Sequence, residues 1–266
     1  MQTSKRAWLY PHTAERDYAR ELLAYSEQVI KETEQRYANL EKYRLDGFSE
    51  DLTALIAGLL LFAADLANPL ISRLPERFRQ VSKFNDKQWV LQVKSGTGLS
   101  IGGEGMPPSE FRLLQNKFGM SFDLFRSEPW LNPLMNNWVA ENTRLIKSIP
   151  EQYLGNVEGM IRRAVQSGLS SKELAKQIEQ TGLVTKNRAK LIAQDQIAKA
   201  DAALTEYRQK DLGLDSYIWQ TAEDSRVRPE HAAMNGKVIR WDKPPSIGHA
   251  GTPVRCRCRA KPLFKI

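Results

Sequence analysis

Two long stretches without proline constrain the fold of this 266-residue chain more than any other feature of its sequence. No proline occurs over residues 12–68 or over residues 151–228. Proline removes a backbone donor and disrupts helix interiors, so a chain that lacks it over such lengths can form long helices. Apolar residues recur at helical spacing in both stretches. The sequence therefore predicts a mainly α fold.

The first stretch predicts two helices. One apolar stripe begins near Tyr18, and Gly47 is the expected stop of that helix. Ser49 is the expected cap of a second helix, which runs to about residue 67. The most apolar part of this second helix, residues 55–64, is about half as long as a bilayer core demands. We therefore expect a buried helix segment there.

The second stretch predicts two further helices. Ser170 and Glu173 have the spacing of a capping box, and Gly182 is the expected end of the short helix that follows them. A longer helix over about residues 185–211 carries apolar residues on one side and ends at Gly213.

The region between these stretches has a different texture. Residues 88–105 combine alternating apolar residues with glycines, which predicts a small β-hairpin or an exposed arm. Short helices are expected over residues 108–118 and 133–147, with loops at Pro129 and Pro150.

The pattern changes again after residue 213. Three short strands are expected over residues 216–221, 237–241 and 254–260, and prolines become frequent. We therefore predict a mainly α protein with a small C-terminal α+β module. The expected divisions are an N-terminal helical region with a hairpin or arm over 1–134, a second helical region over 135–213, and a basic strand and loop module over 214–266.

Positive charge is concentrated in this C-terminal module. The chain has a formal net charge of +8, and residues 224–266 hold ten basic residues against three acidic ones. Such asymmetry is typical of a surface that meets a polyanion or an acidic protein, although basic tails also serve solubility alone. The candidate nucleic-acid-binding residues are Arg226, Arg228, Lys237, Arg240, Arg255, Arg257, Arg259 and Lys261.

Four of the five histidines and cysteines of the chain lie between His231 and Cys258. Side chains two apart on an extended strand share a face, so Cys256 and Cys258 could bind one ion while preceding loops supply His231 and His249. A tetrahedral, structural zinc site would add folding energy that so small a unit lacks. The alternative is that the thiols are reduced and packed, with the histidines as hydrogen-bonding groups of loops. Two cysteines one residue apart exclude a disulfide scaffold and indicate a reducing compartment.

Signals for catalysis are weak. The glycines of residues 96–105 lack the ending of a phosphate loop, and nucleophile-elbow, HExxH and EF-hand patterns are absent. A metal-dependent nuclease is the alternative function, in which neighbouring residues act as acid, base and phosphate clamp. More often such a run is a turn whose charged groups pair with one another. The residues concerned are Glu223, Asp224, Arg226, Arg228, His231 and Asn235.

Several short motifs occur in the order found in a known family. They are Tyr217-Ile218-Trp219, residues 223–231 (EDSRVRPEH), Gly236-Lys237-Val238, Pro244-Pro245, His249 and residues 256–260 (CRCRA). Residues 142–146, 170–178 and 188–196 resemble the helical half of the same family. Over about residues 135–262 the sequence therefore resembles the phage Mu F-like minor head proteins, also called phage head morphogenesis proteins.

This resemblance implies a structural minor capsid protein of a tailed bacteriophage and no enzymatic activity. It implies association with the portal and other head proteins during prohead assembly, and packaged double-stranded DNA is a further expected partner. We expect no membrane and no small-molecule substrate as partners, and zinc as a structural cofactor. The sequence shows no export signal, so the expected location is the phage head, assembled in the host cytoplasm. A host nucleic-acid-binding protein is a third interpretation.

Overall fold

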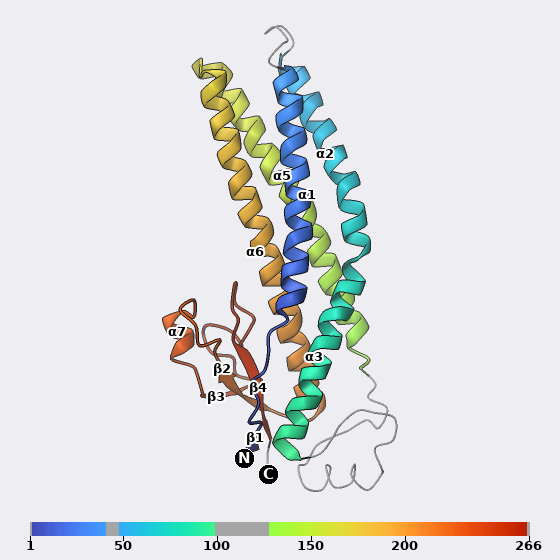
Figure 1. The fold of residues 1–266 in the computed structure, drawn as a ribbon, viewed down its shortest axis with the longest axis vertical. Coiled ribbons are helices and arrows are strands. Elements are labelled where there is room, and N and C mark those ends of the chain that lie inside the picture. Colours follow the sequence, from blue (N-terminus) through green and yellow to red (C-terminus); the bar gives the residue numbers. More distant parts are fainter. Residues whose placement is uncertain (1, 41–47, 99–127, 265–266) are drawn as a thin grey trace. The chain divides into compact units, whose positions relative to one another are not determined.

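The structure is a computed structural model that describes residues 2–40, 48–98 and 128–264 (Figure 1). It confirms a mainly α protein with a small antiparallel sheet at its C-terminal end. The described elements are β1 (Gln2–Thr3), α1 (His12–Leu40), α2 (Phe48–Ser72), α3 (Leu74–Thr97), α5 (Leu131–Ser167), α6 (Ser171–Asp211), β2 (Ser216–Gln220), α7 (Pro229–Ala232), β3 (Val238–Arg240) and β4 (Arg259–Phe264).

The chain forms two compact units, and each collects segments that are distant in sequence. Unit 1 consists of Met1–Ala14, Glu76–Asn136 and Asp195–Ile266. Unit 2 consists of Glu15–Pro75 and Asn137–Gln194. The divisions after residues 134 and 213 remain predictions about organisation along the chain.

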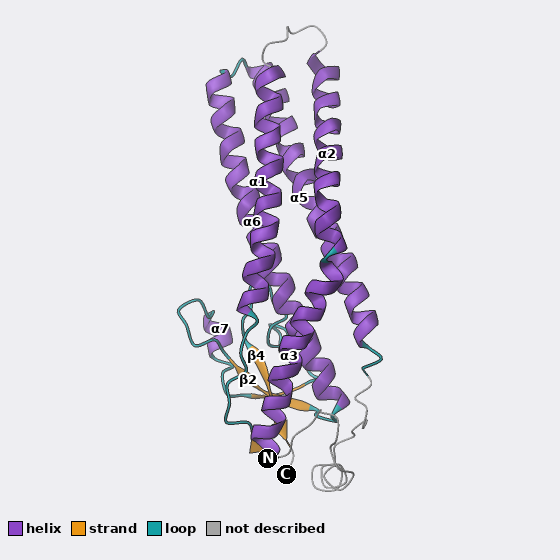
Figure 2. Ribbon diagram, turned by 45° about the vertical axis from the view of Figure 1, so that its right-hand side comes forward, coloured by secondary structure: helices purple, strands orange, loops and turns teal. Residues whose placement is uncertain are grey.

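Unit 2 is a bundle made by α1, α2, the greater part of α5 and the first half of α6, which run alongside one another in both ribbon views (Figures 1 and 2). Its core contains Tyr18, Leu22, Leu59 and Tyr153, all almost fully buried. Burial of each large apolar side chain contributes about 1.5–3 kcal/mol. The hydroxyl of Tyr18 donates to Asn142 Oδ1 at 2.8 Å, so this polar tip is satisfied inside the bundle.

The apolar segment 55–64 is helical, as predicted, but only one face of it is buried. Ile56, Leu59 and Ala63 are inside, whereas 70% of the Leu61 side chain is exposed. The prediction of a buried segment is therefore wrong for the outer face of α2. By length and composition alone, the helical stretch Glu50–Thr97 is long and apolar enough to cross a membrane. One such helix is weak evidence for a membrane span, because core helices of soluble proteins meet the same criteria.

Two predicted helix ends in this bundle are wrong because tertiary packing carries the helices onward. Pro150, predicted in a loop, lies inside α5 and is buried. Gly182, predicted to end a short helix, lies inside α6, where an added Cβ would stand 3.3 Å from Ile30 Cγ2. Glycine is used there for close helix packing and not as a stop. The second helix also continues past the expected residue 67 to Ser72.

Other helix signals are confirmed. Glu173 N–H donates to Ser170 Oγ at 3.3 Å, and Ser170 N–H donates to Glu173 Oε2 at 3.4 Å, so the capping box at the start of α6 is formed. Gly213 has a φ of 76° and follows the end of α6. The expected stop at Gly47, the side chain of Ser49 and the expected helix over 108–118 lie outside what the structure describes.

Unit 1 contains the sheet, with strand order β1-β4-β2-β3 and antiparallel pairing throughout. The strands expected over 216–221 and 237–241 are confirmed as β2 and β3. The third is shifted, because residues 254–258 form a turn and an extended lead-in, and β4 begins only at Arg259. A positive φ of 59° at Arg255 marks that turn.

The hairpin or arm expected over 88–105 is wrong for residues 88–97, which belong to α3. Trp89 and Val93 lie one helical turn apart and pack with Trp8 in a buried cluster of unit 1. Gln92 Nε2 donates to two backbone carbonyls of the N-terminal segment at 3.1 and 3.3 Å. Helical spacing of buried residues thus prevails over the alternation that indicated a strand. Residues 99–105 lie outside the described part of the chain.

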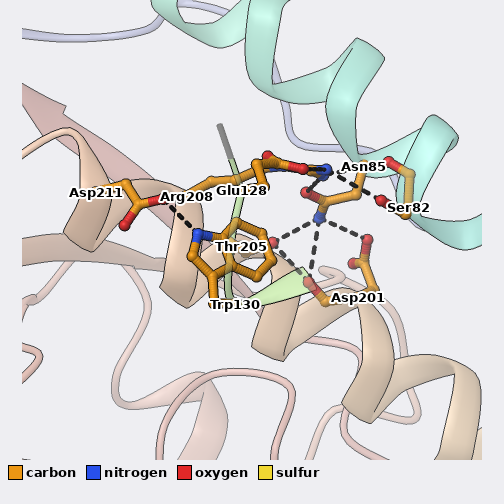
Figure 3. Close-up of polar contacts among 8 residues, drawn as sticks. All are labelled: Ser82, Asn85, Glu128, Trp130, Asp201, Thr205, Arg208 and Asp211. Carbon is orange, nitrogen blue, oxygen red and sulfur yellow. Dashed lines mark hydrogen bonds and ion pairs between the residues drawn. The ribbon is translucent and has the colours of Figure 1, made fainter. Parts of the chain in front are cut away.

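A buried polar network joins α3 to α6 within unit 1 (Figure 3). The amide of Asn85 donates to the backbone oxygen of Asp201 at 3.1 Å, to its carboxylate at 3.0 Å and to Thr205 Oγ1 at 2.8 Å. Arg208 donates to Asn85 Oδ1 at 2.6 Å and to Glu128 at 2.7 Å. The network is shared by both helices and fixes the end of α6 that leads into β2.

Asp201 also connects this network to the sheet. Its carboxylate lies 3.3 Å from Arg259 Nε, at the first residue of β4, and both side chains are almost fully buried. Burial raises the pKa of Asp201, while Arg259 and the Asn85 amide oppose that rise. The position of β4 therefore depends on a charge pair anchored in α6.

Candidate functional site

The C-terminal module is built around the inner face of β2. Tyr217 and Trp219 are two residues apart and point to one side of the strand, where both are fully buried. Trp241, Ala250 and the two cysteines complete this core. The module therefore has an aromatic core of its own, against which the candidate ligands are held.

His231 is placed by α7, a short helix that starts with Pro229 at its first position. The imidazole is 3% exposed and meets the Trp219 ring edge-on, with ring centroids 5.6 Å apart. Packing against a fully buried indole fixes the direction of the histidine ring and turns Nδ1 toward the cysteines.

The two cysteines lie in the extended lead-in to β4. Cys256 N–H donates to Pro253 O at 2.9 Å, which closes the turn that contains Arg255. Cys256 and Cys258 are 3% and 2% exposed, and the half-buried Arg257 between them points elsewhere, to Asp224. Both thiols therefore lie on one side of this segment, as predicted, although residues 256–258 do not form the predicted strand.

His231, Cys256 and Cys258 form a group that could hold a metal ion. His231 Nδ1 lies 3.4 Å from Cys256 Sγ and 3.5 Å from Cys258 Sγ, and all three donor atoms lie within 4.8 Å of one another. Zinc bonds of ordinary length at a tetrahedral angle separate a sulfur and a nitrogen ligand by about 3.6 Å. The donor set and its spacing therefore fit zinc.

The electrostatics of the pair favour one thiolate. The hydrogen bond from Cys258 lowers the pKa of Cys256 to about 5, against the effect of burial, and backbone N–H groups of Cys258 and Gly251 act in the same direction. The same shared hydrogen bond, together with burial, raises the pKa of Cys258. Backbone N–H groups directed at a sulfur are the kind of outer contact that supports a metal thiolate.

His249, the fourth predicted ligand, is placed elsewhere in the module. Its Nδ1 lies 3.1 Å from the Tyr217 hydroxyl, and its ring is 5.0 Å from the ring of Trp241. Burial lowers the pKa of His249, and a hydrogen bond with the backbone of Trp241 opposes this. The Tyr217 oxygen accepts from Ala250 N–H at 3.2 Å, which leaves its own proton to donate to the imidazole. His249 therefore serves the aromatic core, apart from the three-residue group.

The predicted nucleic-acid-binding residues lie in three environments. Arg255 and Lys237 are exposed, and Lys261 is half-buried. Arg259 is only 4% exposed and stacks on Tyr10, with its guanidinium carbon 4.3 Å from the ring centroid. The remaining members form ion pairs within the module, namely Arg226 and Arg257 with Asp224, Arg228 with Glu230, and Arg240 with Asp242.

The cluster considered for a nuclease is held by these same pairs. Arg257 donates to both carboxylate oxygens of Asp224 at 2.6 Å, and this contact lowers the pKa of Asp224 to about 2. Asn235 accepts from Thr221 N–H at 3.0 Å and donates to Glu223 at 3.4 Å. Glu223 has a positive φ of 54°, a conformation that is unusual outside glycine.

Sequence reasoning missed the N-terminal segment. Residues 2–12 lie against the C-terminal module, where β1 pairs with β4 and Trp8 N–H donates to Gln220 at 3.3 Å. No local pattern indicates this, because the partners are more than two hundred residues apart. The short strand of two residues gives too little alternation to detect.

Comparison with known proteins matches the C-terminal part of the chain. A protein-family model described as "Phage Mu protein F like protein" matches residues 155–261. An uncharacterized protein of Haemophilus influenzae (strain ATCC 51907 / DSM 11121 / KW20 / Rd) is 37% identical over 153 residues, which are 57% of this chain and 34% of that protein. The chain thus spans about a third of that relative's length. No solved structure matches. Residues 155–261, which contain His231, Cys256 and Cys258, are a phage Mu protein F-like region, as their motifs predicted.

Proposed function

We propose that this chain is a minor head protein of a tailed bacteriophage that acts structurally in head morphogenesis. The observation that carries this proposal is the family match over residues 155–261, which covers the end of α5, all of α6 and the group of His231, Cys256 and Cys258. The function fits a chain whose C-terminal module contains packed aromatic residues and internal ion pairs. Its partners in this role are other head proteins, including the portal.

The test is deletion of the coding sequence from the phage genome that carries it, with complementation by the full chain. We expect infectious particles to be lost while the major capsid protein is still produced, and the complementing chain to sediment with heads. Infectious heads at the undeleted titre, formed without this chain, would contradict the proposal.

We further propose that zinc bound by His231, Cys256 and Cys258 stabilises the module. The three side chains connect α7 to the lead-in of β4. Metal binding at such a site contributes folding energy directly. The expected result of elemental analysis on the full chain is about one zinc per chain, lost in Cys256→Ser and in His231→Ala.

His249→Gln is the matched control for this experiment, because it removes the fourth histidine or cysteine of the cluster without touching the three-residue group. We expect it to retain zinc. Two results would contradict the proposed site. One is that a Cys256→Ser/Cys258→Ser variant retains zinc, and the other is that the natural chain binds no zinc after incubation with the metal.

The basic surface of the module supports contact with packaged DNA. Arg255 and Lys237 are exposed and Lys261 is half-buried, and none of the three has an ion pair among the described residues. All three lie within the family match. Lysine and arginine contacts to phosphates release counterions, so the affinity should fall with salt and depend little on sequence. Full-chain binding to duplex DNA that stays constant between 50 and about 200 mM salt would contradict this contact.

The nuclease alternative has one observation in its favour. Three protein ligands leave a fourth position of a tetrahedral zinc ion open, as in catalytic sites. Incubation of the full chain with plasmid DNA and divalent metals tests it. The structural role predicts no cleavage. Cleavage that His231→Ala and Asp224→Ala abolish, while His249→Gln retains it, would establish the nuclease instead.

A further inference from the structure

Unit 1 contains a cleft of about 680 Å³, which we call the basic cleft. Its first wall is the N-terminal segment that carries Lys5, Trp8 and Tyr10, and its second wall is formed by β2 and the turn that follows it. Lys261 on β4 also lines it. The volume lies within the range of ligand-binding pockets in proteins.

Basic side chains outnumber acidic ones around this cleft. Its acidic lining residues are Glu223 and Asp224. Asp224 is already paired with two arginines, at 2.6 and 3.2 Å. The basic lining residues are Lys5, Arg226, Arg257, Arg259 and Lys261.

Two of these cations have no carboxylate partner among the described residues. Arg259 is neutralised by buried Asp201, and the other two arginines share Asp224. Lys5 and Lys261 therefore supply the unpaired positive charge of the cleft. Cavities with charge of one sign concentrate counter-ions of the other sign.

The pairing of β1 with β4 brings these two lysines to one cleft. Thr3 pairs with Leu263, and Lys5 follows in the bend after β1, while Lys261 lies two residues before Leu263 on β4. Both lysines line the cleft. Like charges that face one cleft repel each other, and an anion between the two ammonium groups would remove that repulsion.

We propose that the basic cleft is a phosphate-binding site in which Lys5 and Lys261 hold one phosphate group between them. The ligand class is a phosphate ester, supplied by the backbone of DNA or by a free nucleotide. With DNA as the source, the site deepens the proposed function, because it gives the head protein one defined contact to the packaged genome. The site includes Lys5, which lies outside the family match and far from the basic C-terminal residues in sequence.

The test measures binding by the full chain of fluorescein-labelled single-stranded and duplex DNA, with ATP and inorganic phosphate as competitors. The test variant is Lys5→Gln/Lys261→Gln. The control is Lys87→Gln/Lys243→Gln, which removes the same charge from two exposed positions outside the cleft. A Lys5→Arg/Lys261→Arg variant retains both charges and should retain binding.

We expect the affinity for DNA to fall at least about tenfold in the test variant and less than about threefold in the control. The salt dependence should weaken by about one unit of slope in the test variant, because the two lysines contact one phosphate. If ATP binds and DNA does not, and only the Lys5→Gln/Lys261→Gln variant loses ATP binding, the phosphate site is supported and its ligand is a free nucleotide. Equal losses in both Gln variants, or no binding of any probe, would overturn the proposal. This binding assay needs only the purified chain. Its failure would therefore leave the proposed role in head assembly, which the deletion experiment tests, unaffected.

Discussion

Replacement of Asn85 by leucine tests whether the polar network of unit 1 holds α3 to α6. The two side chains have the same number of non-hydrogen atoms and the same branching at Cγ, so Asn85→Leu removes hydrogen bonds without opening a cavity. It takes away the donor to the Asp201 carboxylate and the acceptor for Arg208. Hydrogen bonds to charged groups contribute about 1.5–3 kcal/mol each, so we expect the loss of these two to lower the free energy of unfolding by about 3–6 kcal/mol.

The loss is measured by urea denaturation followed by far-ultraviolet circular dichroism, with the slope against urea compared between variants. Asn136→Leu is the control, because Asn136 belongs to the same unit and is exposed on α5. Exposed substitutions of this kind usually change stability by about 0.5 kcal/mol or less. A loss below about 1 kcal/mol for Asn85→Leu, at an unchanged slope, would refute the reasoning that the buried charges depend on this amide.

Three further predictions follow from the site and the bundle. Chelation of zinc should lower the melting temperature of the natural chain by several degrees and leave that of Cys256→Ser/Cys258→Ser unchanged, as measured by calorimetry. The pKa of Asp224 should be about 2 by NMR titration and should return toward 3.8 in Arg257→Gln; because the folded-state pKa is depressed, the stabilisation is present above about pH 3.8 and is lost as the pH falls to about 2. A titration midpoint near 3.8 in the natural chain would contradict that ion pair. Gly182→Leu should destabilise the bundle by about 1–3 kcal/mol through contact with Ile30. Gly155→Leu is the control, because an added Cβ there meets nothing within 4 Å, and it should not destabilise the bundle. A Gly182→Leu variant as stable in urea as the natural chain would contradict the close packing of α6 against Ile30.

The sequence predicts the local features of this fold better than the long-range ones. The capping box at Ser170, the stop at Gly213 and the first two C-terminal strands depend on neighbouring residues, and all are present. Pro150 and Gly182 lie inside helices although each residue type lowers helix stability locally, because packing against other helices offsets that loss. The alternation around Trp89 also gave a wrong prediction, because the contacts that favour a helix there come from Trp8, far away in sequence.

For the candidate site, spacing indicated the right residues but could not separate three of them from the fourth. His231 and His249 are equally plausible partners of a cysteine pair in sequence. Only the structure shows that Trp219 holds one imidazole beside the thiols, whereas Tyr217 engages the other. The sequence could not indicate Lys5 as a site residue, because its proximity to Lys261 depends on pairing between the two strands that are most distant in sequence.

That pairing of β1 with β4 has a consequence for the order of events during synthesis. Gln2 aligns with Phe264, so the sheet joins two segments that lie far apart in the chain and are translated at different times. Contacts of such sequence separation form slowly, since a very long loop must close first. Until residue 264 has left the ribosome, the N-terminal segment has no strand to join, and Trp8 and Trp89 lack the Phe264 ring that covers them. Unit 1 is therefore a part of the nascent chain that would benefit from chaperone protection.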